Sequence, residues 1–226
     1  PLLVADVAAG CGDQPGLRAL SFEVDDAERF VIVGPSGAGK TTLLRAIAGL
    51  IPVSRGHVEI AGSDRTHLAA EQRDAVYLHQ TPVLFPHLDV FENVAFPLRV
   101  RGVATPEIHD RVARVLDSVQ LGSFARRRAH ALSGGQRHRV ALARAIIARP
   151  AVLLLDEPLS SPYLALRADV RAVILDIAFT TQPPRITLPH APRPPPRMGR
   201  PLCVCPGPTP ASVHAAPDES PTSVDP

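Results

Sequence analysis

The stretch Gly34-Pro35-Ser36-Gly37-Ala38-Gly39-Lys40-Thr41 decides the fold of this chain. It fits the pattern G-x-x-x-x-G-K-[ST], whose glycines let successive backbone N–H groups turn inward around a phosphate chain. A short apolar run over 30–33 precedes it, and apolar residues follow at helical spacing over 43–50. Strand, glycine-rich loop and helix therefore occur in the order that a phosphate-binding loop requires. A glycine-rich turn with a surface lysine is the alternative, which this flanking pattern disfavours.

Each part of the loop has an expected task. Lys40 is expected to neutralise the terminal phosphates, and the Thr41 hydroxyl is expected to ligate Mg²⁺. The helix that begins at about Lys40 points the positive end of its dipole at the nucleotide. The predicted nucleotide-binding residues here are Gly34, Pro35, Ser36, Gly37, Ala38, Gly39, Lys40, Thr41 and Thr42.

A second apolar run, over 152–155, is typical of a central strand in a parallel sheet and ends in two carboxylates. We expect Asp156 to hold Mg²⁺ directly or through water, and Glu157 to polarise a water that attacks the γ-phosphate. The alternative is that both acids only cap a loop before Pro158. The phosphate-binding loop favours the first interpretation because it requires a magnesium partner.

The segment Leu132-Ser133-Gly134-Gly135-Gln136 leads into the helix-like run over 137–145. Ser133 and the amides of Gly134 and Gly135 stand at the start of that helix, where backbone N–H groups form an anion-binding surface. An ordinary helix cap at Ser133 is the plainer interpretation, and both can hold together.

Together these segments resemble the ATP-binding subunit of an ATP-binding cassette (ABC) transporter. The resemblance implies an α/β fold: a P-loop NTPase core with a mostly parallel sheet, an N-terminal antiparallel β portion and an inserted helical subdomain. It places the ATPase domain at 1–182, with the helical subdomain at about 83–148. It also implies ATP and Mg²⁺ as cofactors and ATP hydrolysis coupled to transport.

By the same resemblance, the serine-glycine segment contacts ATP held by the phosphate-binding loop of a partner cassette, which adds Ser133, Gly134, Gly135 and Gln136 to the nucleotide-binding set. Gln80 resembles the glutamine that approaches Mg²⁺ and the attacking water. The implied catalytic residues are Glu157, Gln80 and His190. The implied metal ligands are Thr41, Gln80 and Asp156.

The implied partners are a second copy of the cassette, integral membrane permease subunits and a solute-binding protein, with no direct contact to nucleic acid. The stretch over 85–94 resembles bacterial importer cassettes, which favours uptake, and the loop over 85–100 is expected to dock the permease. The expected location is cytoplasmic, on the inner face of the cell membrane. An apolar stripe that includes Ile108, Val112 and Leu116 predicts a helix in the inserted subdomain.

Composition agrees with one α/β core and an insertion in 226 residues with a formal net charge of +2. No apolar run approaches the roughly 20 residues needed to span a bilayer, and no secretory leader is visible. Any transport path is therefore expected to belong to another polypeptide. The cysteines Cys11, Cys203 and Cys205 lack the spacing of a metal site.

The end of the chain departs from the family pattern. Residues 183–226 hold 14 of the 25 prolines, which predicts a largely extended or disordered tail. Tyr163 stands where the family usually has an aspartate that couples the two ATP sites. His190, the candidate γ-phosphate sensor, lies between Pro189 and Ala191, and proline suits an inner strand poorly.

Two other functions stay open at this point. One is a nucleotide-binding module with impaired hydrolysis, which a phosphate-release assay beside Glu157→Gln would separate. The other is an ABC-type ATPase that acts on DNA or ribosomes, which co-purification with an integral membrane protein would exclude.

Overall fold

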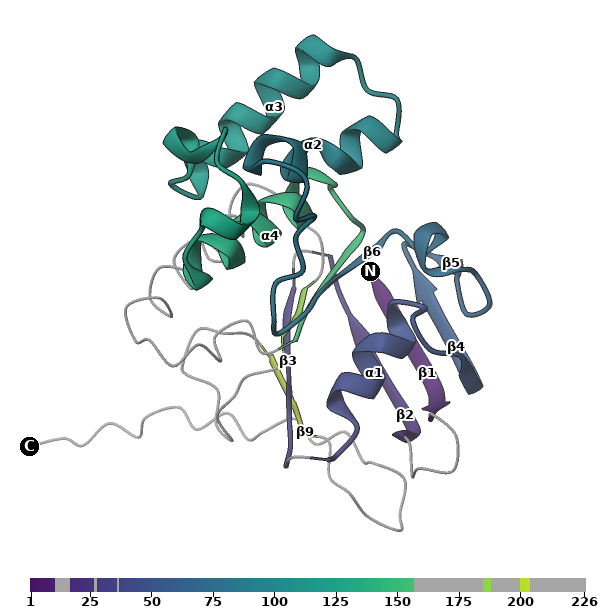
Figure 1. Cartoon of the computed structure of the whole chain (residues 1–226). Coiled ribbons are helices and arrows are strands. Elements are labelled where there is room, and N and C mark those ends of the chain that lie inside the picture. The colour runs from purple at the N-terminus through teal and green to yellow at the C-terminus, as the bar shows by residue number, and fades with distance from the viewer. Residues whose placement is uncertain (11–16, 27, 36, 157–184, 188–199, 204–226) are drawn as a thin grey trace, which may run out of the picture.

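A computed structural model describes most of the first two thirds of the chain and two short strands beyond it (Figure 1). The described residues are 1–10, 17–26, 28–35, 37–156, 185–187 and 200–203. Several residues discussed above lie outside the described residues: Ser36, Glu157, Tyr163 and His190, and the cysteines Cys11 and Cys205.

The N-terminal part forms an antiparallel sheet in the strand order β2-β1-β4-β5. Its strands are β1 (Leu2–Ala9), β2 (Leu17–Val24), β4 (Val53–Ile60) and β5 (Ser63–Asp64). Buried and partly exposed residues alternate along most of β1, so that Leu2, Val4 and Val7 face the core. The register shifts after Ala5, where Gly56 takes a φ of 81° and a Cβ atom would lie 2.3 Å from the Ala5 carbonyl oxygen. Only glycine fits this bulge.

A second sheet is parallel and has the order β6-β7-β8-β3-β9. Its strands are β3 (Arg29–Val33), β6 (Ala75–Leu78), β7 (Val152–Leu155), β8 (Arg185–Thr187) and β9 (Arg200–Cys203). All of β7 is buried, because alternate side chains enter two different cores. Val152 and Leu154 face helix α1 (Lys40–Ile47) and the antiparallel sheet, whereas Leu153 and Leu155 face the other helices. The apolar run thus reflects a strand covered on both faces.

The sequence predicts a largely extended or disordered tail over residues 183–226, and the structure describes seven of these residues, which lie in two short strands. The described residues of that stretch, β8 and β9, extend the parallel sheet, and β8 lies between β7 and β3. Pro201 is accommodated because β9 is an edge strand, where a missing backbone donor costs no central ladder bond. The rest of the proline-rich stretch lies outside the described residues, and the domain boundary at 182 stays a prediction.

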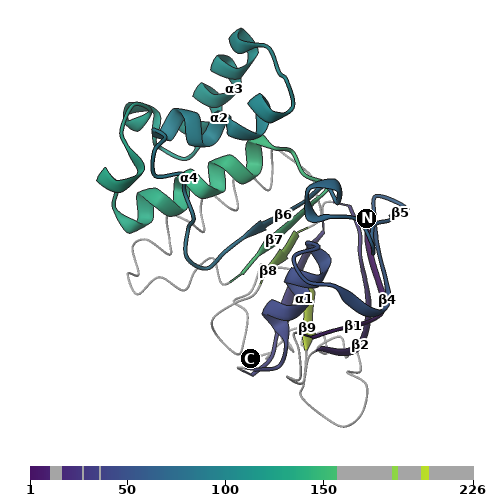
Figure 2. The same cartoon turned by 45° about the vertical axis from the view of Figure 1, so that its right-hand side comes forward.

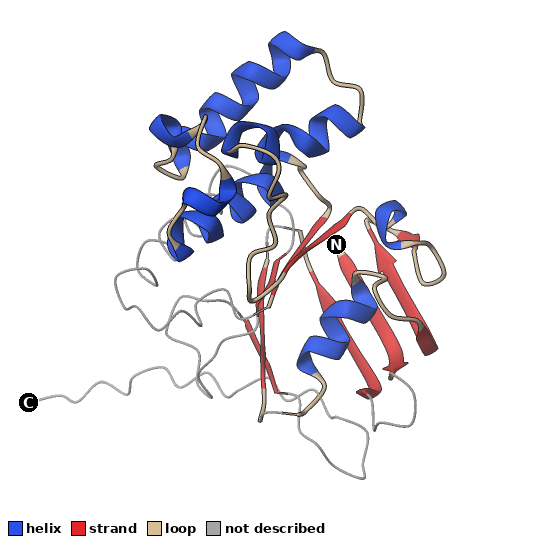
Figure 3. Ribbon diagram, viewed as in Figure 1, coloured by secondary structure: helices blue, strands red, loops and turns tan. Residues whose placement is uncertain are grey.

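Helix α1 (Lys40–Ile47) lies between the two sheets, and the other α-helices gather in a separate region (Figures 2 and 3). These are α2 (Val90–Val100), α3 (Thr105–Ser118) and α4 (Gly134–Ile147), accompanied by the short 3₁₀ helices η2 (Gly122–Phe124) and η3 (Ala129–Ala131). A further 3₁₀ helix, η1 (Ala70–Gln72), lies between β5 and β6 in the chain. The predicted stripe of α3 is confirmed, since Ile108, Val112 and Leu116 are buried in the shared core.

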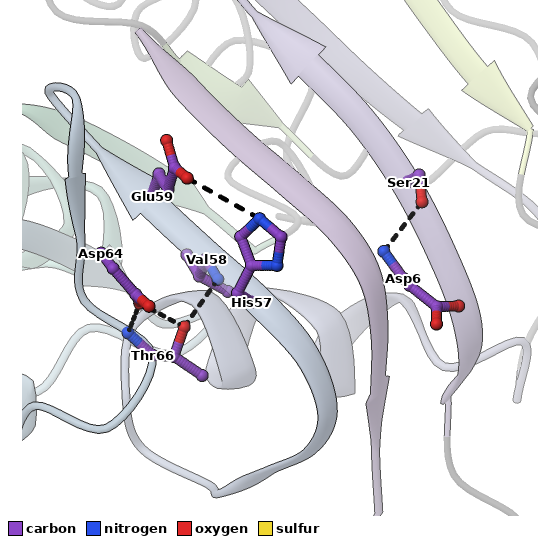
Figure 4. A network of polar contacts seen from close by, with 7 residues as sticks. All are labelled: Asp6, Ser21, His57, Val58, Glu59, Asp64 and Thr66. Carbon is purple, nitrogen blue, oxygen red and sulfur yellow. Dashed lines mark hydrogen bonds and ion pairs between the residues drawn. The ribbon is translucent and has the colours of Figure 1, made fainter.

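Polar contacts fasten the outer edge of the antiparallel sheet (Figure 4). The Thr66 hydroxyl accepts a hydrogen bond from the Val58 amide (2.9 Å) and donates one to Asp64 (2.5 Å). Asp64 also accepts a bond from the Thr66 amide (2.8 Å). The hydrogen bond from the Thr66 side chain, followed by that from its backbone, lowers the pKa of Asp64. These bonds fold the chain after β5 back onto β4.

Arg73 joins this edge to the end of α1. The residue is 3% exposed, and its guanidinium donates to the carbonyl oxygens of Ala46 (2.7 Å), Ile47 (3.2 Å), Leu68 (2.9 Å) and Thr66 (2.5 Å). The Ala46 and Ile47 carbonyls lie in the last turn of α1, where backbone acceptors have few partners within the helix, and the Ala46 oxygen also accepts a bond from the Gly49 amide (3.1 Å). Burial lowers the pKa of Arg73. The side chain therefore fixes the helix that follows the phosphate-binding loop.

Replacing Arg73 with methionine should lower the free energy of unfolding by about 3 kcal/mol, because buried carbonyl groups lose their donors. Guanidinium chloride denaturation measures this. The matched control is Arg55→Met, since Arg55 is exposed and pairs with exposed Asp6. We expect the control to change stability by less than about 1 kcal/mol. Equal, small effects of both substitutions would contradict the capping role of Arg73.

Candidate active site

The phosphate-binding loop leads from β3 into α1, as the strand, loop and helix pattern predicted. Gly37 and Gly39 have φ values of 80° and 89°, a left-handed conformation that favours glycine. Gly39 is the N-cap of α1 and provides no capping side chain. The first N–H groups of the helix are thus left for an external acceptor, which suits a phosphate.

Lys40 folds back over this loop. Its Nζ donates to the carbonyl oxygens of Gly34 and Pro35, each at 2.8 Å. The ammonium group therefore lies on the loop, and phosphate oxygens can replace the neutral carbonyl acceptors with stronger charge-assisted bonds.

Asp156 directly follows β7 and is 7% exposed. Its amide donates to the Leu78 carbonyl oxygen (3.0 Å), which continues the pairing of β6 and β7 by one residue. The Thr41 hydroxyl lies 3.3 Å from Oδ1, and the Tyr77 hydroxyl donates to Oδ2 at 2.5 Å. Thr41 and Asp156, two of the three predicted metal ligands, are thus hydrogen-bonded neighbours although 115 residues separate them in the sequence.

These oxygen donors fit Mg²⁺, a hard cation that prefers carboxylate, hydroxyl, phosphate and water oxygens. No group of three or more His, Cys, Asp or Glu side chains that could hold a metal ion occurs in the described part of the chain. A magnesium ion at Thr41 and Asp156 would therefore draw its other ligands from phosphate and water, as is usual for this ion.

Tyr77 was missing from the sequence-based site. Burial, followed by the hydrogen bond and negative charge of Asp156, raises its pKa to about 12, while Arg45 acts in the opposite direction. The hydroxyl therefore keeps its proton at neutral pH and donates a hydrogen bond to the carboxylate. The sequence shows only that Tyr77 precedes Gln80 by three residues. It does not show that the strand with Tyr77 pairs with the strand before Asp156.

Gln80 lies two residues after β6 and is exposed. The backbone carbonyl oxygen of Gln80 accepts a hydrogen bond from Nε2 of His138 (2.9 Å). Nδ1 of His138 lies 3.3 Å from the Gly134 carbonyl oxygen. His138, which the sequence reasoning also missed, therefore ties the segment after β6 to the first turn of α4. The role of Gln80 at metal and water stays a prediction.

The serine-glycine segment forms the start of α4. Ser133 is the N-cap: its Oγ accepts a bond from the Gln136 amide (3.2 Å), and Gln136 Oε1 accepts one from the Ser133 amide (2.9 Å). This reciprocal capping box confirms the plainer interpretation. Ser133 and Gly134 are exposed, whereas Gly135 is buried. The capped end of α4 thus leaves a serine and a glycine at the surface.

The two helix starts belong to different parts of the molecule (Figure 1). Helix α1 packs mainly on β1, β2 and β6, whereas α4 packs mainly on α2, α3 and β6. Among the described residues, no hydrogen bond or ion pair joins Ser133 to the phosphate-binding loop.

A groove of about 460 Å³ runs between the helical region and the edge strand β6. Its apolar walls include Phe85, Phe96, Val100 and Ala145. Phe96 and Val100 are 41% and 71% exposed. The rings of Phe85 and Phe96 lie 4.6 Å apart, which places part of the predicted docking loop in this wall.

Buried Asn93 shapes the loop beside the groove. Its Oδ1 accepts from the Phe85 amide (2.8 Å), and its Nδ2 donates to the carbonyl oxygens of Phe85 (3.1 Å) and Asp89 (2.9 Å). On the other side, Arg144 donates to the Val83 carbonyl oxygen (2.6 Å) and lies over the Phe85 ring (5.1 Å). Burial lowers the pKa of Arg144. Both contacts hold Phe85 in place.

Comparison with known proteins identifies the family. A family model described as ABC transporter matches residues 17–160, which include the phosphate-binding loop, the serine-glycine segment and both carboxylates. The chain belongs to the ABC transporter family. Within the described residues of this ABC chain, no helix is both long and apolar enough to cross a membrane.

Curated relatives of this ABC chain include importer subunits. The spermidine/putrescine import ATP-binding protein PotA of Hahella chejuensis is 45% identical over 170 residues, covering 75% of this chain and 47% of that protein. The sn-glycerol-3-phosphate import ATP-binding protein UgpC 2 of Rhizobium johnstonii is 43% identical over 169 residues, covering 75% and 49%. The chain thus spans about half the length of the curated relatives it matches.

Solved structures confirm the ABC cassette fold. The dimeric structure of the ATP-binding cassette MJ0796 bound to ADP and Pi has a TM-score of 0.78 and 24% identity, and covers 90% of this chain and 94% of that chain. The ATP-binding cassette MJ1267 has a TM-score of 0.78 and 22% identity, with 90% and 87% covered. The expected α/β fold with an antiparallel N-terminal sheet and a helical region is therefore confirmed.

Proposed function

We propose that this chain binds and hydrolyses ATP and thereby powers the uptake of a solute through separate membrane subunits. The observation that carries the proposal is the meeting of the Thr41 hydroxyl and the Asp156 carboxylate at 3.3 Å beside the loop that bears Lys40. This juxtaposition of a lysine-bearing loop, a hydroxyl and a buried carboxylate is what Mg-ATP requires.

The proposed chemistry is electrostatic. Lys40 and the backbone amides of the loop stabilise the charge of the transferring phosphoryl group. Thr41 and Asp156 hold Mg²⁺, which when bound neutralises charge on the phosphates. Gln80 and Glu157 orient and polarise the attacking water, and His190 contacts the γ-phosphate.

The nucleotide is proposed to bind between two copies of the chain. The exposed, capped start of α4 offers Ser133 and Gly134 to an anion, and within one chain α4 packs mainly on α2, α3 and β6. A second copy can supply the missing half of each site, as in a symmetric dimer. The dimeric structure of MJ0796 supports this arrangement by analogy.

The groove at β6 and the helical region is the proposed docking site of a permease subunit. Its exposed apolar side chains, Phe96 and Val100, suit a partly apolar segment of a membrane protein. The importer names of PotA and UgpC support uptake, with a solute-binding protein as a further partner. The chain would then act in the cytoplasm, on the inner face of the cell membrane. No contact with nucleic acid is proposed.

Co-purification from detergent-extracted membranes tests this proposal. We expect the tagged chain to capture an integral membrane protein with several transmembrane helices. Phe96→Asp should abolish the capture without changing ATP affinity, since a charge in the groove cannot be buried without cost. The matched control is Leu50→Asp, because Leu50 is 48% exposed and lies outside the groove. Equal capture by both variants, or no membrane protein in any sample, would contradict the proposal.

A further inference from the structure

The Tyr77 hydroxyl lies behind the carboxylate that is proposed to hold Mg²⁺. Tyr77 on β6 pairs with Leu154 on β7. Leu154 and Asp156 are two residues apart, so their side chains point to the same face of the sheet. The Tyr77 ring packs in the core between α1 and the sheet, and its hydroxyl reaches Asp156 Oδ2 at 2.5 Å. The tyrosine therefore contacts the oxygen that does not face Thr41.

We propose that Tyr77 is a positioning residue, which holds Oδ2 of Asp156 so that Oδ1 faces Thr41 and the magnesium position. The proposal rests on the proposed function, because it assumes that Asp156 and Thr41 take the metal. Tyr77 itself touches neither nucleotide nor metal; it acts through the carboxylate.

The hydrogen bonds of Asp156 favour this role over simple filling of the core. Among the described residues, the side-chain partners of its carboxylate are the hydroxyls of Tyr77 and Thr41. The Thr41 contact is long, at 3.3 Å, and a bound cation would compete for both of its oxygens. The short bond from Tyr77 is therefore the contact that fixes the carboxylate when metal binds. Partners of this kind orient metal ligands, and their loss typically costs about 10- to 100-fold in metal affinity.

The gain in ATP affinity that Mg²⁺ produces tests this role and does not depend on a measurement of hydrolysis. ATP affinity is measured by calorimetry in excess Mg²⁺ and in excess EDTA, and the ratio of the two affinities is compared between variants. Tyr77→Phe keeps the ring and removes the hydroxyl, and should reduce the ratio about tenfold while ATP affinity in EDTA is unchanged. A ratio equal to that of the unaltered chain would overturn the proposal.

A double-mutant cycle separates positioning from packing. In an Asp156→Asn background, Tyr77→Phe should have no further effect on the ratio, because the oriented carboxylate is already gone. Additive losses would overturn the proposal. Tyr77→Met provides a second side chain without a hydroxyl and should agree with Tyr77→Phe, provided that thermal unfolding confirms a folded chain for at least one of them.

The proposed function and this inference fail in different ways. If the unaltered chain shows no gain in ATP affinity from Mg²⁺, the proposed metal site is wrong. If the unaltered chain shows the gain and both hydroxyl-free variants retain it, only the role of Tyr77 is wrong.

Discussion

Glu157→Gln is expected to lower the steady-state rate of phosphate release about a thousandfold, while ATP affinity stays the same. Glu157 follows Asp156, the carboxylate that comes directly after β7 and is proposed to hold Mg²⁺. A general base contributes about 10²- to 10⁴-fold to a rate, and glutamine keeps the shape of glutamate but cannot accept a proton. Binding should persist because Lys40, the loop amides and Asp156 are unaltered.

A phosphate-release assay beside a binding titration measures both effects. The matched control is Glu107→Gln, because Glu107 lies on the exposed side of α3 and pairs only with Arg111 among the described residues. The control should hydrolyse ATP at the rate of the unaltered chain. If the unaltered chain has no measurable rate, the chain is a binding module and the proposed hydrolysis is wrong; if Glu157→Gln keeps its rate, another group is the base.

Much of the fold was predictable because local patterns and tertiary structure agree. The apolar run before Gly34 is β3, the helical spacing after Lys40 is α1, and the run that ends at Asp156 is a strand buried on both faces. Such segments carry their own turn chemistry and burial pattern, which is why single-sequence reasoning succeeds there.

The position of β8 and β9 in the parallel sheet could not be predicted from the sequence. β8 inserts between β3 and β7, and β9 adds the edge beyond β3, although both come from a proline-rich stretch that reads as a tail. Pairing with neighbouring strands of the sheet outweighs the low strand propensity of this stretch, although the two strands are only three and four residues long.

The candidate site was likewise only partly predictable from the sequence. Thr41 and Asp156 were predicted as partners because the chemistry of Mg-ATP requires both. Tyr77 and His138 were missed because their roles depend on the alignment of β6 with β7 and on the contact of α4 with the segment after β6. No spacing within the sequence encodes either contact.

A substitution in either half of the proposed ATP site, the phosphate-binding loop or the serine-glycine segment, should abolish ATP-dependent dimerisation. Lys40→Met removes the charge that holds the phosphates, and Ser133→Arg places a bulky side chain on the exposed start of α4. Each substitution should weaken the dimer about 100-fold or more, because a symmetric dimer loses the same contact twice. All chains carry Glu157→Gln so that ATP persists. Ser133→Arg also removes a helix cap, which costs about 1 kcal/mol, so folding is checked by thermal unfolding.

An equimolar mixture of the two damaged chains can rebuild one complete site, with the phosphate-binding loop of the Ser133→Arg chain and the serine-glycine segment of the Lys40→Met chain. Sedimentation velocity in Mg-ATP measures this directly. The proposed shared site predicts monomers for each damaged chain alone and an ATP-dependent heterodimer in the mixture. Monomers in the mixture, with ATP bound to the Ser133→Arg chain, would contradict it.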